Sequence, residues 1–154
     1  MAIEFRSAPL DSGDGALLVG AMVDELAVIY DGLDINDESM PKASANELGP
    51  PHGDFLVGYD GSDAVCCGGL KRLPDGAVEI KRMYVVPEAR GNGLARTLLV
   101  ALEDRARAMG FTTVRLDTGP KQPGARALYE SAGYTQIPNF NANPMADYFG
   151  EKQL

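Results

Sequence analysis

The residues with the clearest chemical potential lie in the run Arg90-Gly91-Asn92-Gly93, which follows Pro87 and opens a helical pattern. The first turn of a helix leaves backbone N–H groups without partners, and the helix dipole adds about half a positive charge there. Two glycines, which lack a Cβ atom, let a bulky anion approach this backbone closely. Arg90 and Arg96 add guanidinium groups, whose geometry suits phosphate. The segment therefore predicts a site for a pyrophosphate group.

Two familiar phosphate-binding patterns do not fit this segment. A P-loop needs a Lys-Ser/Thr pair after its last glycine, and the chain has none there. A dinucleotide fingerprint needs a third glycine or alanine at the position that Arg96 occupies. Both absences disfavour a nucleotide-binding domain. The pattern that remains is Arg90-x-x-Gly93-x-Ala95.

This pattern resembles the acetyl-coenzyme A (acetyl-CoA) signature of the GNAT family of N-acetyltransferases, which reads Arg/Gln-x-x-Gly-x-Gly/Ala. Downstream, Ala125-x-x-Leu128-Tyr129-x-x-x-Gly133-Tyr134 resembles the second conserved block of that family, at the expected separation. One position departs from the family, because Gln122 stands where asparagine is usual, seven residues before Tyr129. Two blocks in the right order are more specific than either alone, and together they cover residues 79–134.

The resemblance implies an α/β (α+β) fold with a mixed, mostly antiparallel sheet flanked by helices, in which strands four and five splay apart. It also implies that acetyl-CoA is the acyl donor and that its pantetheine arm pairs with the backbone of strand four. The N–H of Val85 would then face the thioester carbonyl and stabilise the negative charge that develops there. The expected cofactor-binding residues are Met83, Tyr84, Val85, Val86, Arg90, Gly91, Asn92, Gly93, Leu94, Ala95, Arg96 and Gln122.

Glu79 is the candidate catalytic base. It begins the strand ahead of the glycine turn and, by the alternation of a strand, would share a face with Lys81, Met83 and Val85. An amine must lose a proton before it attacks a thioester, and a carboxylate with a raised pKa could take that proton. Some family members use a glutamate in this region, often through water. The alternative is a glutamate that only pairs with Lys81 or Arg82.

Tyr129 is the candidate catalytic acid, since a phenol with a pKa of about 10 is matched to an alkyl thiolate. It lies in the Leu-Tyr pair of the second block, which the family places on a short helix near the cofactor. The alternative is a core tyrosine on that helix. Neither matching block contains a cysteine that could carry an acyl group, so direct transfer within a ternary complex is expected.

The elements that would position these residues follow from the apolar pattern. Turn residues between positions 59 and 77 predict that strands two to four form an antiparallel meander, and Gly68 and Gly69 indicate a bulge in it. The expected strands are 3–5, 55–59, 64–70, 77–86, 112–117, 134–137 and 146–153, and the expected helices are 17–29, 94–109 and 124–131.

Residues 31–53 show little periodicity and contain three prolines. A long irregular segment in a compact domain is usually functional or mobile. This one could shape the substrate site, as the resemblance implies, or could be a solvated connector. A short helix around residues 43–48 is expected within it. His52, the single histidine, is expected at the surface, and a contact with the substrate stays open as the alternative.

The length of 154 residues fits one domain over residues 1–154. The formal net charge of −8 argues against a nucleic-acid partner and favours a cationic acceptor such as an amine. No apolar run approaches the roughly 20 residues of a membrane span, and the first residues lack the pattern of a secretion signal. A cytoplasmic protein without a membrane partner is therefore expected. One histidine and the adjacent Cys66 and Cys67 cannot assemble a zinc site.

Together these features predict an acetyl-CoA-dependent N-acetyltransferase that acts on the primary amine of a small molecule. Two alternatives stay open, namely a non-catalytic acyl-CoA sensor on the same fold and an enzyme that acetylates peptides or proteins. The chain could also form a homodimer, if the final strand from Ala146 paired with another copy.

Overall fold

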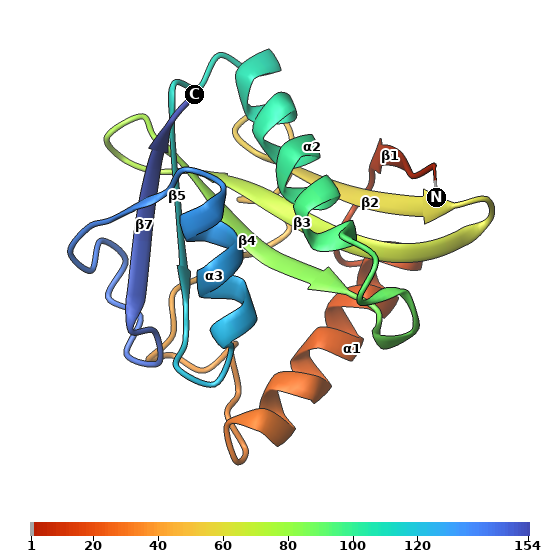
Figure 1. Cartoon of the computed structure of the whole chain (residues 1–154), viewed down its shortest axis with the longest axis horizontal. Coiled ribbons are helices and arrows are strands. Elements are labelled where there is room, and N and C mark those ends of the chain that lie inside the picture. The colour runs from red at the N-terminus through yellow and green to blue at the C-terminus, as the bar shows by residue number, and fades with distance from the viewer. Residues whose placement is uncertain (1) are drawn as a thin grey trace.

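Residues 2–154, which the computed structural model describes, form a seven-stranded sheet with helices on both of its faces (Figure 1). A single 3₁₀ turn, η1 (Pro87–Ala89), precedes the second helix. The strands are β1 (Glu4–Ser7), β2 (Asp54–Asp60), β3 (Asp63–Arg72), β4 (Val78–Val85), β5 (Thr113–Thr118), β6 (Thr135–Gln136) and β7 (Tyr148–Gln153), and the helices are α1 (Gly13–Ile29), α2 (Leu94–Ala108) and α3 (Pro123–Ser131).

The sheet is antiparallel except at one pair of strands. The order is β1-β2-β3-β4-β5-β7-β6, and only β4 and β5 run parallel. Their pairing is short, since Val78 lies beside Val114 and Glu79 beside Arg115, and no pair follows. Figure 1 shows the two strands diverging toward their carboxyl ends. The expectation of a mixed, mostly antiparallel sheet with strands four and five splayed is therefore confirmed.

A β-bulge interrupts β4 at its centre. Cys67 pairs with Tyr84 and Gly69 pairs with Lys81, so Gly68 alone faces two residues of β4. The first of these two, Arg82, has a left-handed backbone with φ of 59°. The bulge expected near Gly68 is confirmed, although the extra residue belongs to the partner strand.

The bulge changes which side chains of β4 share a face. Ile80 upstream and Met83 and Val85 downstream all pack into the apolar cluster beneath α2. Because an extra residue shifts the alternation by one, Glu79 and Lys81 lie on the opposite face, toward α1. The expectation that Glu79 shares a face with Met83 and Val85 is therefore wrong, since it assumed an uninterrupted strand.

Two apolar clusters hold the helices against the sheet. One contains the inward side of α2, including Leu98 and Leu102, together with α3 residues and the near face of the sheet. The other contains Leu18 and Met22 of α1 and the opposite face of the sheet. A Cβ atom on Gly68 would lie 2.6 Å from Leu102 Cδ1, so this glycine lets α2 pack close to β3.

The segment of residues 31–53 packs against the fold rather than projecting into solvent. Ile35, Met40 and Leu48 are all buried. The helix expected around residues 43–48 is wrong, because that stretch forms one turn only. Ser44 and Glu47 close the turn, with Glu47 Oε1 accepting the Ser44 N–H at 3.1 Å. This segment therefore acts as a fixed wall of the domain.

The carboxyl-terminal strand lies inside the sheet. β7 pairs with β5 from Thr113–Gln153 to Thr118–Tyr148, and its other edge pairs with β6. The expectation that this strand could pair with another copy is wrong, because both of its edges are used within the chain. Across residues 2–154, no helix is both long enough and apolar enough to cross a membrane.

Candidate active site

A cavity of about 660 Å³ opens where β4 and β5 part. One end is lined by Arg90, Gly93 and Arg96, at the start of α2. The other end is lined by Lys81 and Asp117, from the middle of β4 and the end of β5. Residues from α1, α3 and the segment 31–53 complete its wall. The sheet thus provides one continuous space that joins the predicted anion site to a polar cluster.

The glycine turn adopts the backbone that an anion site needs. Gly91 and Gly93 have φ angles of 87° and 76°, which side-chain-bearing residues rarely adopt. Gly93 is the N-cap of α2, and no side chain caps the helix there. Arg90, Gly93, Ala95 and Arg96 line the cavity, among the residues expected in this turn. Gly91 and Asn92 are exposed outside the lining, and Leu94 is buried in the core.

Both arginines of the turn have partners within the chain. Arg90 Nε donates to the Val85 carbonyl at 2.9 Å, and its NH2 donates to Glu25 Oε2 of α1 at 2.7 Å. Arg96 donates to the hydroxyl of Ser131 and so links α2 to α3. These contacts hold two cationic groups at the mouth of the cavity.

The backbone of Val85 faces the gap between the strands. Val86 N–H donates to the Val65 carbonyl of β3 at 2.9 Å, and residues of an antiparallel pair alternate between bonding toward and away from the partner. The N–H and C=O of Val85 therefore point away from β3. The bond from Arg90 to the Val85 carbonyl agrees with this orientation. Met83 and Tyr84 also line the cavity, whereas Val86 does not.

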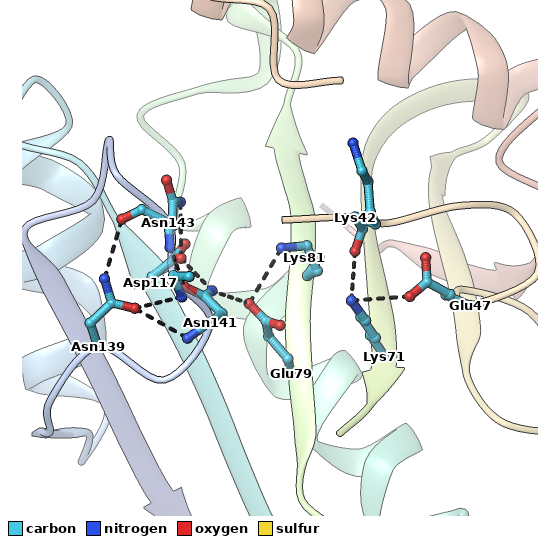
Figure 2. A network of polar contacts seen from close by, with 10 residues as sticks. Lys42, Glu47, Lys71, Glu79, Lys81, Asp117, Asn139, Asn141 and Asn143 are labelled. Atoms are coloured by element: carbon cyan, nitrogen blue, oxygen red, sulfur yellow. Dashed lines mark hydrogen bonds and ion pairs between the residues drawn. The ribbon is translucent and has the colours of Figure 1, made fainter. Parts of the chain in front are cut away.

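Glu79 is buried, with 1% of its surface exposed, and lies just behind the cavity wall. Its Oε2 accepts from Asn141 Nδ2 at 2.8 Å and from Lys81 Nζ at 3.4 Å (Figure 2). Burial raises the pKa of this carboxyl, as does the nearby charge of Asp117, whereas Lys81 and Asn141 oppose the rise. Glu79 therefore holds its proton more readily than an exposed glutamate.

Asp117 connects the cavity to Glu79. It lies near the carboxyl end of β5, two residues beyond the last pair with β4, and lines the cavity. It accepts from Asn141 Nδ2 at 2.7 Å and from Asn143 Nδ2 at 3.0 Å. Figure 2 shows the Asn141 amide between the two carboxylates. Asn139 fixes this loop, because its Oδ1 accepts the Asn141 N–H at 3.1 Å. Sequence reasoning missed this cluster, whose one visible signal is asparagine at positions 139, 141 and 143.

Tyr129 lies in the cavity wall on α3, with 6% of its surface exposed. Its hydroxyl donates to Met83 Sδ at 4.0 Å, and its ring lies 6.0 Å from that of Tyr134. Burial, with a smaller contribution from the charge of Asp117, raises the pKa of the phenol above its usual value. The hydroxyl is therefore a donor throughout the neutral pH range.

Gln122, the position that departs from the family pattern, joins α3 to the end of α1. Its Oε1 accepts from the Tyr30 hydroxyl at 3.3 Å, and both residues line the cavity. Gly119 makes this contact sterically feasible, since a Cβ there would lie 2.1 Å from the Tyr30 hydroxyl oxygen. His52 is exposed and lies outside the lining.

The site is thus an uncapped helix terminus beside an opened parallel pair of strands, and comparisons with known proteins identify the class. A model described as "Acetyltransferase (GNAT) family" matches residues 21–134. An uncharacterized N-acetyltransferase of Schizosaccharomyces pombe is 30% identical over 150 residues, covering 94% of this chain and 89% of that protein. The chain therefore belongs to the GNAT family of acetyl-CoA-dependent N-acetyltransferases.

Other relatives agree over shorter or more distant matches. An "IAA acetyltransferase" of Azospirillum brasilense is 40% identical over 88 residues, covering 56% of this chain and 58% of that protein, little more than half of its length. A solved structure from Klebsiella pneumoniae superposes with a TM-score of 0.75 at 28% identity, covering 99% of this chain and 97% of that one. A GNAT family acetyltransferase of Elizabethkingia anophelis with acetyl-CoA bound shares the fold, with a TM-score of 0.70 at 16% identity over 99% of this chain and 98% of that one.

Proposed function

We propose that the protein transfers an acetyl group from acetyl-CoA directly to the primary amine of a small molecule. The observation that carries this proposal is the orientation of Val85, whose N–H faces the space between β4 and β5. A donor fixed there stabilises negative charge on the thioester carbonyl oxygen, an effect of roughly 3 kcal/mol where it has been measured.

The residues present fit acetyl-CoA along the length of the cavity. The free N–H groups at the start of α2 suit the pyrophosphate, with Arg90 and Arg96 beside them. The backbone of Val85, which points away from β3, suits the pantetheine arm, and Met83 and Tyr84 line the cavity beside it. The related Elizabethkingia enzyme binds acetyl-CoA on the same fold, which supports this assignment.

Glu79 is proposed as the base, acting through water. The buried carboxyl cannot touch the acceptor, but it shares Asn141 with Asp117, which reaches the cavity. Asp117 would hold the ammonium form of the acceptor by charge attraction. Glu79 would take the proton that the amine must release before it attacks the thioester. Its raised pKa brings it closer to the range where such a transfer is effective.

Tyr129 is proposed as the acid that returns a proton to the departing thiolate of coenzyme A. Its hydroxyl already donates to a sulfur atom, Met83 Sδ, so its surroundings suit a second sulfur acceptor. Direct transfer is favoured over an acyl-enzyme, because burial raises the pKa of the Cys66 and Cys67 thiols to about 11 and about 12. Neither thiol is then a useful nucleophile at neutral pH.

The experiment combines acetyl-CoA with a panel of small amines and short peptides. Thiol release reports turnover, and mass spectrometry identifies the acetylated product. We expect release with small primary amines and slower release with peptides, because Leu33, Ile35 and Met40 wall the acceptor end. Calorimetric binding of acetyl-CoA without release against the whole panel would instead support a sensor. Preferential turnover of peptides would support a peptide or protein acetyltransferase.

A further inference from the structure

Arg82 is a charged residue of the cavity wall that the proposed proton transfers do not use. It occupies the β-bulge of β4, where its φ of 59° turns it out of the regular alternation of the strand. Its side chain is half-buried and lines the acceptor end of the cavity. Sequence reasoning treated it only as an alternative partner for Glu79.

No side chain within residues 2–154 gives Arg82 a hydrogen bond or an ion pair. The acidic groups whose charges reach it are Glu79, Asp117 and Glu47. Each of these carboxylates already receives closer donors from lysine or asparagine side chains, as Figure 2 shows. Arg82 therefore lines the cavity with a guanidinium that has no hydrogen-bonded partner among the described residues.

Lys81, the cationic residue next to Arg82, has an acidic partner within the chain. Lys81 also lines the cavity, but its Nζ lies 3.4 Å from Glu79 Oε2 and is neutralised there. A half-buried guanidinium without a hydrogen-bonded counter-charge is costly, and burial accordingly lowers the pKa of Arg82. Its planar fork of N–H donors matches a carboxylate, which can accept two parallel hydrogen bonds. An anionic group on the acceptor would supply the missing partner.

The position of Arg82 limits the size of that acceptor. It lies three residues before Val85 on β4, but the bulge sets Arg82 and Met83 together opposite Gly68, which is two residues from Cys66, the partner of Val85. A strand rises about 3.3 Å per residue, so the two backbones are roughly 7 Å apart. The arginine side chain covers part of this span. An acceptor whose amine faces the thioester at Val85 must therefore carry its anionic group only a few bonds away.

The cavity lining also includes acidic and apolar residues that an acceptor could contact. Asp117 offers a carboxylate to an ammonium group, whereas Leu33, Ile35 and Met40 offer an apolar wall. A zwitterion with an apolar side chain matches all three surfaces. Such an acceptor is also compatible with the net charge of −8 on the protein, because a zwitterion carries no net negative charge.

We propose that Arg82 binds the carboxylate of a free amino acid with an apolar side chain and holds its amine toward the Val85 N–H. This inference rests on the proposed acetyl transfer and narrows its acceptor from a primary amine to an amino acid. Arg82 is then a residue that determines specificity and takes no proton itself.

The test compares acceptors that differ only at the carboxylate. Leucine, leucinamide and 3-methylbutylamine share one side chain, and phenylalanine, phenylalaninamide and phenethylamine form a second matched set. With saturating acetyl-CoA, we expect the free amino acid to have the highest kcat/KM of its set, by roughly 10- to 100-fold, the range expected for hydrogen bonds to a charged group.

Variants of Arg82 identify the residue responsible. Arg82→Gln should lower kcat/KM for the free amino acid far more than for the amide and amine and so abolish the preference, and Arg82→Lys should retain part of it. Both replacements keep a long side chain at the same left-handed position, so backbone strain is comparable. Arg6→Gln, on exposed β1 at the far edge of the sheet, is the matched control and should change nothing.

The outcomes separate this inference from the transferase reaction. Preferred turnover of the amines or amides would overturn the role of Arg82 while acetyl transfer to amines stands. An equal loss for all three members of a set in Arg82→Gln, with unchanged acetyl-CoA affinity and melting temperature, would also overturn it. Absence of turnover with every member, despite binding of acetyl-CoA, would overturn both proposals.

Discussion

The carboxylates of Glu79 and Asp117, from the adjacent strands β4 and β5, share a single amide donor. Asn141 Nδ2 lies 2.8 Å from Glu79 Oε2 and 2.7 Å from Asp117 Oδ2. The two strands stop pairing at Glu79, so this shared donor spans the point where the sheet begins to open. The proposed base is therefore tuned by a loop that lies 62 residues away in sequence.

Asn141→Ala should move the acidic limb of the pH profile of kcat/KM to higher pH. The hydrogen bond from Asn141 lowers the pKa of Glu79, so its removal raises that pKa further and leaves more of the base protonated at a given acidic pH. A hydrogen bond to a charged group is worth about 1.5–3 kcal/mol, so kcat/KM on the limb should fall about tenfold or more. Steady-state kinetics from acidic to neutral pH measures the shift.

Asp117→Asn gives the opposite expectation for the same limb. The charge of Asp117 raises the pKa of Glu79, so its removal lowers that pKa and should move the limb to lower pH. The replacement keeps nearly the same shape, which makes it a matched partner for Asn141→Ala. Shifts in the same direction, or none in either variant, would remove Glu79 from the role of base.

Arg90→Ala should weaken acetyl-CoA binding about tenfold or more, by the loss of charge-assisted hydrogen bonds to phosphate. Isothermal titration calorimetry at low salt measures the affinity directly. Arg107→Ala is the control, because Arg107 lies near the other end of α2 and pairs with Asp104 at 2.9 Å on the surface. Equal affinities of the wild type, Arg90→Ala and Arg107→Ala for acetyl-CoA would show that Arg90 serves only to join Val85 and Glu25.

Local sequence patterns predicted the parts of the site whose conformation depends on contiguous residues. The turn at Gly91 and Gly93 and the helix that carries Tyr129 each follow from contiguous residues with defined conformational needs. The family resemblance also predicted that Arg90 and Tyr129 belong to the site, and both residues line the cavity.

The features of the site that could not be predicted depend on contacts between residues far apart in the sequence. The faces of Glu79 and Met83 depend on a bulge that exists only because β3 and β4 pair in a particular register. The contact between Asn141 and Glu79, and the position of Arg82 at the cavity wall, depend on the same tertiary arrangement. The segment 31–53 has no periodicity because its apolar residues pack against several elements rather than along one face.

Tyr129→Phe should lower kcat by roughly 10- to 1000-fold and change KM for acetyl-CoA much less. The range follows from the usual contribution of a positioned acid, about 10²–10⁴-fold, reduced because coenzyme A thiolate also leaves without full protonation. Burial raises the pKa of this phenol, so wild-type activity should not decline at moderately alkaline pH through its ionisation. Pre-steady-state kinetics with a good acceptor separates transfer from product release.

Tyr134→Phe is the control for Tyr129→Phe. The Tyr134 hydroxyl donates to Glu103 Oε2 at 2.7 Å within the core and lies outside the cavity lining. This variant should lose stability rather than turnover per folded molecule. Unchanged kcat in Tyr129→Phe would assign Tyr129 to packing and exclude it as the acid.

Gly119→Ala should distort the cavity between α1 and α3. A Cβ atom at this position would lie 2.1 Å from the Tyr30 hydroxyl oxygen and 2.9 Å from the Met145 carbonyl oxygen, so the chain must shift. Overpacking of this kind typically costs about 1–3 kcal/mol, and we expect a comparable loss in the free energy of unfolding together with weaker acetyl-CoA binding. Gly124→Ala, five residues further along in the first turn of α3 and with open space around its Cβ, should leave both unchanged. Urea denaturation and calorimetry test the pair, and Tyr30→Phe in the Gly119→Ala background should recover part of the loss by removing the clashing oxygen. Equal stability and affinity in the two alanine variants would mean that the contact between Tyr30 and Gln122 does not shape the site.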